Sequence, residues 1–172
     1  MRVDIWSDVV CPFCFIGKKR LEKAAEQAGV ELEVFWHSYQ LDPDAPIRQE
    51  KSNSERLAEK YNRSIAEVEE MQRNIAAMAK EEGIEFNWEH ANSGNTFNAH
   101  RIIHLAQSLN LGNEAKEAFF YSYMTQGLAI GERETIEDVA ARIGLNPNQV
   151  EDVLNSDEFA EFVKYDEEVA RD

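Results

Sequence analysis

The sequence contains two cysteines, Cys11 and Cys14, which stand two residues apart in the segment Cys-Pro-Phe-Cys. Structural disulfides call for cysteines spread along a chain, whereas this pair, between a strand-like run and a helical pattern, is typical of a thiol–disulfide redox motif. In that chemistry the first thiolate attacks a substrate sulfur to form a mixed disulfide, and the second cysteine attacks the first and releases the product. We therefore predict that Cys11 is the nucleophile, that Cys14 is the resolving cysteine, and that the Cys11–Cys14 disulfide is the redox group.

The place of Cys11 at the start of a predicted helix favours the thiolate form that this chemistry requires. Only the thiolate attacks a disulfide, and the free N–H groups and dipole of a helix N-terminus lower the pKa of a cysteine placed there. Pro12 fits the first helical turn because it has no N–H to lose, and the N–H groups of Phe13 and Cys14 then point toward the Cys11 sulfur. We also expect the Phe13 side chain to shape the approach to this sulfur.

A metal site is the alternative use of the two cysteines, because Cys-x-x-Cys can be half of a zinc site that needs two further Cys or His ligands. His100 and His104 stand four residues apart on a predicted helix and could face one metal, but their distance in sequence from Cys14 is far outside zinc-finger spacing. We therefore predict no metal and interpret both as ordinary helix residues. His37, next to Trp36 on a predicted strand, either lines the sulfur site or is an ordinary core or surface histidine.

A β–α–β unit is predicted around the cysteines. Residues 2–6 and 31–39 are the strand candidates, and the second run carries aromatic residues that favour strands. Between them, the apolar positions of residues 15–29 follow helical spacing, and Gly29 ends the helix. Two strands joined through one helix are parallel with a right-handed crossover, so residues 1–45 form one unit with the cysteines at its first strand-to-helix turn.

Residues 46–172 are predicted to form a helical block. The capping box of Ser64 and Glu67 starts one helix, and Gly83 ends it. Apolar and polar residues alternate over residues 84–88, so a short strand is possible there, but we favour an extended loop that places three large apolar side chains in the core. Further helices are expected at 96–109, 114–126, 135–143, 147–154 and from residue 156 onward.

Composition excludes several classes of partner. The chain has 33 acidic and 18 basic residues and a net charge of −15, so nucleic acids and anionic membranes would be repelled. No run approaches the roughly 18 apolar residues of a spanning helix, and Met1 is followed by a charged strand-like segment instead of a signal peptide. We therefore expect a cytoplasmic protein, where a single Cys-x-x-Cys is more typical of catalysis than of a structural disulfide.

Three segments together resemble the FrnE-type branch of the DsbA-like dithiol–disulfide isomerases. They are the active-site run WSDVVCPFCFIGK at residues 6–18, the run LDPDAP at residues 41–46 and the run NTFNAHR at residues 95–101. The resemblance implies an α/β, thioredoxin-like fold in which residues 1–45 are the N-terminal half of the domain, and residues 46–172 are a helical insertion and the start of the returning helix. It also implies that the insertion covers the active site and helps to form the substrate groove.

Residues outside the two cysteines have two interpretations. A plain helix N-cap by Asn95 or Thr96 explains much of the run at 95–101; the alternative is a substrate-binding segment. The substrate-binding candidates in that segment are Asn95, Thr96, His100 and Arg101. The candidates that shape the sulfur site are Asp8, Pro12, Phe13 and His37.

The chain departs from the family pattern at its C-terminal end. The family continues with a loop that holds a cis-proline beside the redox pair, then a β-hairpin and a final helix. No proline of this chain lies in such a loop; the four are Pro12, Pro43, Pro46 and Pro147. We therefore expect this hairpin and helix to be absent from the chain, which is then either a truncated version of a longer protein or a natural fragment. A sheet of two strands is marginal, and its exposed edge favours homodimerisation or instability.

The leading functional prediction is a thiol–disulfide oxidoreductase or isomerase that acts on protein or small-molecule disulfides. The second is a glutathione-dependent enzyme of the related 2-hydroxychromene-2-carboxylate isomerase and kappa-class glutathione transferase group, which the same fold and the Asn-x-x-x-Ala-x-Arg run resemble. That group uses a serine where this chain has Cys11, which favours dithiol chemistry. The third is a binding module, either a redox chaperone whose helical block holds a client or a metal-binding protein.

Overall fold

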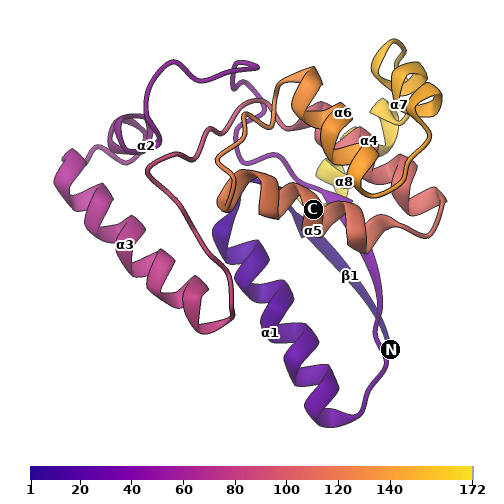
Figure 1. The fold of residues 1–172 in the computed structure, drawn as a ribbon, viewed down its shortest axis with the longest axis horizontal. Coiled ribbons are helices and arrows are strands. Elements are labelled where there is room, and N and C mark those ends of the chain that lie inside the picture. Colours follow the sequence, from indigo (N-terminus) through magenta and orange to yellow (C-terminus); the bar gives the residue numbers. More distant parts are fainter. Residues whose placement is uncertain (172) are drawn as a thin grey trace.

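The computed structural model describes residues 1–171, which form two strands and eight helices (Figure 1). In chain order the elements are β1 (Arg2–Ser7), α1 (Pro12–Ala28), β2 (Glu33–Ser38), α2 (Asn53–Tyr61), α3 (Ile65–Glu81), α4 (Phe97–Ser108), α5 (Gly112–Met124), α6 (Arg133–Arg142), α7 (Pro147–Leu154) and α8 (Ala160–Val169). None of the helices in this described range is long and apolar enough to cross a bilayer.

β1 and β2 pair in parallel, and α1 connects them. The register places Ser7 opposite Ser38 at the ends of the strands. α1 ends at Gly29, whose left-handed conformation, with φ at 65°, is one that glycine adopts without the strain of a side chain. The structure confirms the predicted β–α–β unit, with a second strand at 33–38 where the sequence indicated 31–39.

Local signals set the starts of most helices. α1 begins at Pro12, earlier than the apolar periodicity that starts at Phe15, because Cys11 takes the N-cap position and proline the first turn. α3 begins with the predicted capping box: the Ser64 side chain accepts from the Glu67 N–H, and the Glu67 carboxylate accepts from the Ser64 N–H at 2.9 Å. α7 has its predicted bounds, and α4, α5 and α6 lie within two residues of theirs.

The last helix begins later than its sequence pattern indicated. A helix from residue 156 onward was expected, but α8 begins at Ala160. Phe159, just before it, has a φ of 62°, in the left-handed region that residues with a side chain seldom adopt. The chain therefore turns between α7 and α8 and does not run straight from one helix into the next.

The core lies between the small sheet and the helical block. Trp36 of β2 is buried, and Phe120 of α5 contacts it edge to face with ring centroids 6.4 Å apart. Phe15 of α1 stacks on the same Phe120 at 4.9 Å, and Figure 1 shows α1 and α5 meeting beside the strands. β2 also contacts α4 and α8. Helices thus pack against β2 of the two-stranded sheet, and the expected dimerisation stays a prediction.

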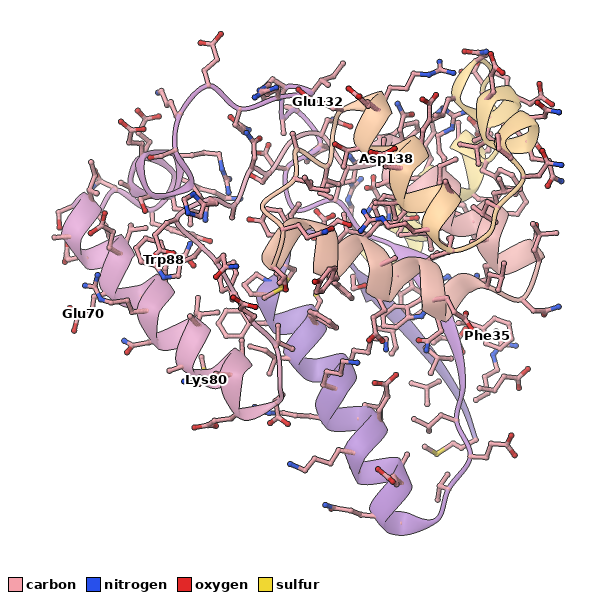
Figure 2. All side chains as sticks on the ribbon, in the orientation of Figure 1. Phe35, Glu70, Lys80, Trp88, Glu132 and Asp138 are labelled. Atoms are coloured by element: carbon pink, nitrogen blue, oxygen red, sulfur yellow. The ribbon has the colours of Figure 1, made fainter. Side chains whose placement is uncertain are left out.

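The connection between α3 and α4 is extended, as predicted for residues 84–88. Ile84, Phe86 and Trp88 are all buried, and this stretch pairs with no strand in the described chain. Figure 2 shows Trp88 on the side of α2 and α3, while Glu70 on the outer face of α3 points to solvent. The three apolar side chains belong to the same hydrophobic core cluster as Ile75 and Ala79 of α3.

Candidate active site

Cys11 and Cys14 lie where β1 passes into α1. Cys11 is the N-cap of α1, with extended backbone angles, and its N–H donates to the Asp8 carbonyl at 3.3 Å. The Cys14 N–H donates back to the Cys11 carbonyl at 3.1 Å. Both thiols are free and half-buried, and they lie one helical turn apart. This is the strand-to-helix turn that the sequence predicted.

The two thiols differ in acidity. Hydrogen bonding from the Cys14 thiol, with help from the N–H groups of Cys14 and Phe13, lowers the pKa of Cys11 to about 7 against the opposing effects of burial and the Asp8 charge. The same interaction, seen from the other side, raises the pKa of Cys14 far above its usual range, and burial adds to the rise. Near neutral pH about half of the Cys11 thiol is therefore ionised, whereas the Cys14 thiol stays neutral.

A buried carboxylate, Asp8, ties three segments together behind the cysteines. Its Oδ1 accepts from the Val9 N–H at 2.8 Å and from His100 Nε2 at 3.2 Å, and its Oδ2 accepts from the Leu41 N–H at 2.8 Å. Burial favours the neutral acid, but the hydrogen bonds and the nearby Lys116 outweigh it, so the pKa of Asp8 lies below its usual value. Burial lowers the pKa of His100. Asp8, a candidate for shaping the sulfur site, thus holds the turn together with His100, which was a substrate-binding candidate but is buried against Asp8.

Lys116 is a buried cation beside this turn that the sequence analysis missed. Its Nζ donates to the Ser7 carbonyl at 2.9 Å and lies over the rings of Trp36 and Phe120, at 5.4 and 5.5 Å from their centroids. Burial lowers its pKa to about 8. The available signal was a lysine three and four residues before Phe119 and Phe120, which places it on the apolar face of a predicted helix.

His37 does not shape the sulfur site. Its ring stacks on Trp6 with centroids 4.3 Å apart, and its two nitrogens lie 3.0 Å from Asp4 Oδ1 and 2.8 Å from Asp166 Oδ1. It is absent from the walls of the cleft that contains Cys11. The contact with Asp166 instead fastens α8 to β2, so of the two interpretations of His37 the contacts favour an ordinary structural histidine.

Arg101 is also structural, which corrects its assignment as a substrate-binding residue. Its buried guanidinium donates to the carbonyls of Val153, Ser156 and Glu158, the last at 2.8 Å, and to the Asn98 side chain. All four acceptors belong to the protein. Arg101 therefore holds the turn between α7 and α8, and it is not among the residues that line the cleft beside Cys11.

Asn95 and Thr96 differ in their contacts: the Asn95 side chain is bound to the backbone near the start of α4, whereas Thr96 faces the cleft. Asn95 Oδ1 accepts from the Phe97 N–H at 3.0 Å and its Nδ2 donates to the Pro43 carbonyl at 2.9 Å, so this side chain is occupied by local structure. Thr96 is the N-cap residue of α4 but makes no capping hydrogen bond with its side chain. It lines the cleft that contains Cys11.

The helix histidines do not converge on one site. His100 contacts Asp8, whereas His104 Nε2 lies 3.0 Å from Ser38 Oγ and 3.1 Å from Asp166 Oδ2. Within residues 1–171, no group of three or more His, Cys, Asp or Glu side chains is placed to hold a metal ion.

A cleft opens beside Cys11, between the β–α–β unit and the helical block. It contains about 840 Å³ of space free of protein atoms, its open mouth included. Cys11, Pro12 and Phe13 form one wall, and side chains from α2, α3 and the 84–96 connection form the other. Cys14 is absent from these walls. The helical block thus covers the site, as the family resemblance implied, and leaves the Cys11 side accessible.

Comparisons with known proteins agree with this geometry. The crystal structure of probable DsbA oxidoreductase SCO1869 from Streptomyces coelicolor is 30% identical, with a TM-score of 0.91, over 99% of this chain and 75% of that chain. Two further structures share the fold over 99% of this chain. 2-Hydroxychromene-2-carboxylate isomerase is 17% identical, with a TM-score of 0.69 over 79% of its chain. Cytosolic disulfide reductase DsbM from Pseudomonas aeruginosa is 14% identical, with a TM-score of 0.68 over 78% of its chain.

The match to a family model extends over almost the whole sequence. The model described as a DSBA-like thioredoxin domain matches residues 2–172, which include the cysteine pair, the buried carboxylate at Asp8 and all the helices described above. The chain belongs to the DSBA-like thioredoxin domain family.

Proposed function

We propose that this protein is a thiol–disulfide oxidoreductase or isomerase in which Cys11 attacks the substrate and Cys14 resolves the intermediate. The observation that carries the proposal is the asymmetry of the pair. Cys11 lies on the wall of the cleft with a pKa of about 7, while Cys14 lies off that wall with a strongly raised pKa. One sulfur is thus accessible and about half ionised near neutral pH, and the other is protected and neutral, which is what a nucleophile and its resolving partner require.

The proposed reaction exchanges one disulfide for another. The Cys11 thiolate attacks one sulfur of the substrate disulfide, a Cys11–substrate S–S bond forms, and the other substrate sulfur leaves as a thiolate that takes up a proton from solvent. Cys14 then loses its proton and attacks Cys11 Sγ, and the bound substrate leaves as a thiol. The substrate has gained two electrons and the protein holds a Cys11–Cys14 disulfide. The reverse sequence oxidises a dithiol.

The comparisons support this class of activity and two further features. The Streptomyces coelicolor protein is described as a probable DsbA oxidoreductase. The Pseudomonas aeruginosa protein is described as a cytosolic disulfide reductase and was also solved with GSH. We propose on this basis that the present protein acts on protein or small-molecule disulfides in the cytoplasm, and that glutathione is a reductant for its Cys11–Cys14 disulfide. The likeness to the isomerase concerns the fold alone and does not favour that activity.

Trapping of the mixed disulfide tests the proposal. The reduced Cys14→Ser variant is mixed with glutathione disulfide, quenched in acid and analysed by intact mass and peptide mapping. We expect a stable glutathione adduct at Cys11. The wild type should instead pass to an internal disulfide without lasting adduct, and the matched Cys11→Ser variant should stay unmodified. An adduct at Cys14 in Cys11→Ser that forms as fast as the one at Cys11 would contradict the assigned roles.

A further inference from the structure

Two polar side chains in the cleft have hydrogen-bonding groups that the protein leaves unused. Within residues 1–171, three buried side-chain atoms lack a hydrogen-bond partner: Arg56 Nε, Gln72 Oε1 and Ser7 Oγ. Arg56 on α2 and Gln72 on α3 both line the cleft beside Cys11. Buried polar atoms are nearly always paired, and those that are not call for an explanation. Two of the three unpaired atoms therefore fall on the same cavity as the proposed nucleophile.

Gln72 is the more deeply placed of the two. Its side chain lies in α3, the residue is only 3% exposed, and burial of an amide without a partner costs stability. Arg56 uses Nη2 to bind Asn53 Oδ1 at 3.1 Å and leaves Nε without a partner. An amide can offer an N–H or a carbonyl oxygen to a ligand, and a guanidinium is suited to bind a carboxylate with two N–H groups.

The charge at this wall is positive and uncompensated, in a protein whose net charge is −15. No carboxylate oxygen of the described chain lies within 4.0 Å of the charged groups of Arg56 or Lys60, and Lys60 Nζ contacts only the Leu41 carbonyl, at 3.4 Å. Two acidic residues also line the cleft. Asp8 is satisfied by its own hydrogen bonds, and Asp42, which is half-buried, lines the same cleft but forms no ion pair with Arg56 or Lys60 in the described chain. Arg56 and Lys60 therefore place unpaired positive charge on the cleft wall of a protein that is otherwise strongly anionic.

Most of the remaining lining is apolar, although Asn53, Ser93 and Thr96 also contribute to it. The apolar lining on the side of the helical block comprises Leu57, Met71, Ile75, Phe86 and Tyr123. Pockets for small molecules are mostly apolar with a few polar groups that fix orientation, and the lining of this cleft has that character. The cleft thus presents, in one space, a nucleophilic sulfur, an apolar wall, a free cation and a free amide.

We infer that this cleft binds a small acidic disulfide or thiol, with its carboxylate on Arg56, a second polar group on the Gln72 amide and its sulfur at Cys11. This inference rests on the proposed function, since the Cys11 thiolate must attack the bound disulfide. The S–S bond of the ligand breaks as the Cys11–ligand bond forms, and the leaving half departs as a thiolate. Arg56 and Gln72 set specificity and take no part in the exchange itself.

Two small aromatic disulfides that differ in charge test the assignment of Arg56. Dithiobis(nitrobenzoate) carries a carboxylate on each ring, whereas dithiodipyridine is neutral. Stopped-flow absorbance gives the rate constant for reaction of each reagent with the reduced full chain. We expect Arg56→Gln to slow the reaction with dithiobis(nitrobenzoate) roughly tenfold or more, as loss of a charged hydrogen bond predicts, and to change the reaction with dithiodipyridine by less than about twofold. The matched control is Arg63→Gln, an exposed arginine outside the cleft.

Each outcome has a distinct meaning. Equal loss with both reagents in Arg56→Gln would mean that Arg56 acts on the Cys11 thiolate, and no loss with either would mean that it binds no ligand; both results overturn the inference. Failure of wild-type Cys11 to react with either reagent would overturn the proposed function itself.

A second variant removes the dependence on one substitution. If the Gln72 amide binds the ligand and has no partner in the free protein, Gln72→Leu removes an unpaired buried amide, and the variant should melt at a higher temperature. It should also react more slowly with glutathione disulfide, by about threefold or more. A lower melting temperature would show that the amide serves the fold, and an unchanged rate would show that it does not contact the ligand. Either result counts against the binding site.

Discussion

Removal of the Cys14 thiol should raise the pKa of Cys11, because hydrogen bonding from that thiol is the largest influence on it. The Cys11 pKa is about 7. A hydrogen bond to a charged group contributes about 1.5–3 kcal/mol, and a change of one unit in pKa corresponds to about 1.36 kcal/mol. Cys14→Ala should therefore raise the pKa of Cys11 by roughly one to two units. The helix N–H groups remain, so we do not expect a rise beyond the value of a free thiol.

The consequence for reactivity is smaller than the change in ionisation. At pH 7 the thiolate fraction should fall from about one half to about 1–10%. A more basic thiolate is also a better nucleophile, and this offsets part of the loss. Reaction of Cys11 with a small disulfide at neutral pH should therefore slow by only about two- to sixfold. The midpoint of the pH profile is thus the more sensitive measurement.

The assay is iodoacetamide labelling of the reduced protein as a function of pH, with each modified cysteine assigned by mass spectrometry. Cys14→Ser is the matched control, because its hydroxyl can still donate to the Cys11 thiolate and should hold the midpoint closer to that of the wild type. If Cys14→Ala titrates at the same pH as the wild type, the N–H groups of the helix start alone set the acidity of Cys11, and the argument from the paired thiol is wrong.

Three further predictions concern the groups that hold the site. Arg101→Met leaves the carbonyls of Val153, Ser156 and Glu158 without their donor. The unfolding free energy measured in urea should therefore fall by about 3 kcal/mol or more, while the pH midpoint of Cys11 labelling stays unchanged. A fall of less than about 1 kcal/mol would contradict the structural role. Hydrogen bonds from His104, Ser38 and His37 outweigh the effect of burial and lower the pKa of Asp166. The stability that ionised Asp166 contributes is therefore present above the unfolded pKa of about 3.9 and is lost as the pH falls through the folded pKa. The difference in unfolding free energy between wild type and Asp166→Asn should narrow below about pH 4, and a constant difference would refute this. The folded pKa of Lys116 is about 8, below the unfolded value of about 10.4, so the unfolded state holds more protons between these pH values. As the pH rises through this window, the unfolding free energy of the wild type should increase relative to that of Lys116→Met. A difference that stays constant or decreases would mean that the lysine is more hydrated than the structure shows.

The features that the sequence predicted well are those whose causes are local. The start of α7 follows from Asn146 as N-cap and Pro147 in the first turn, and the start of α3 follows from its capping box. The redox pair itself is a spacing of two residues at a strand-to-helix turn. In each case the residues that decide the structure are neighbours in the sequence, so the pattern alone is sufficient.

The features that it predicted poorly depend on contacts between distant segments. Arg101 binds carbonyls more than fifty residues away, and His37 binds Asp166 from the last helix, so neither partner was visible from the pattern around the residue. The start of α8 failed because Phe159 takes a left-handed conformation that no residue type there signals. Gln72 and Lys116 were missed for the same reason as Arg101, because helical periodicity shows that a face is buried but not what it is buried against.

The buried Asp8 carboxylate has two opposing effects on the site: it stabilises the fold around Cys11, and it makes the Cys11 thiol less acidic. Its three hydrogen bonds join the strand-to-helix turn, the chain after β2 and α4, so the carboxylate stabilises the arrangement that exposes Cys11. The same negative charge raises the pKa of Cys11, while the charge of Lys116 lowers that of Cys14. An uncharged residue at position 8 would make Cys11 more acidic but would weaken the attachment of the helical block. The acidity of the nucleophile is therefore limited by the carboxylate that assembles the site.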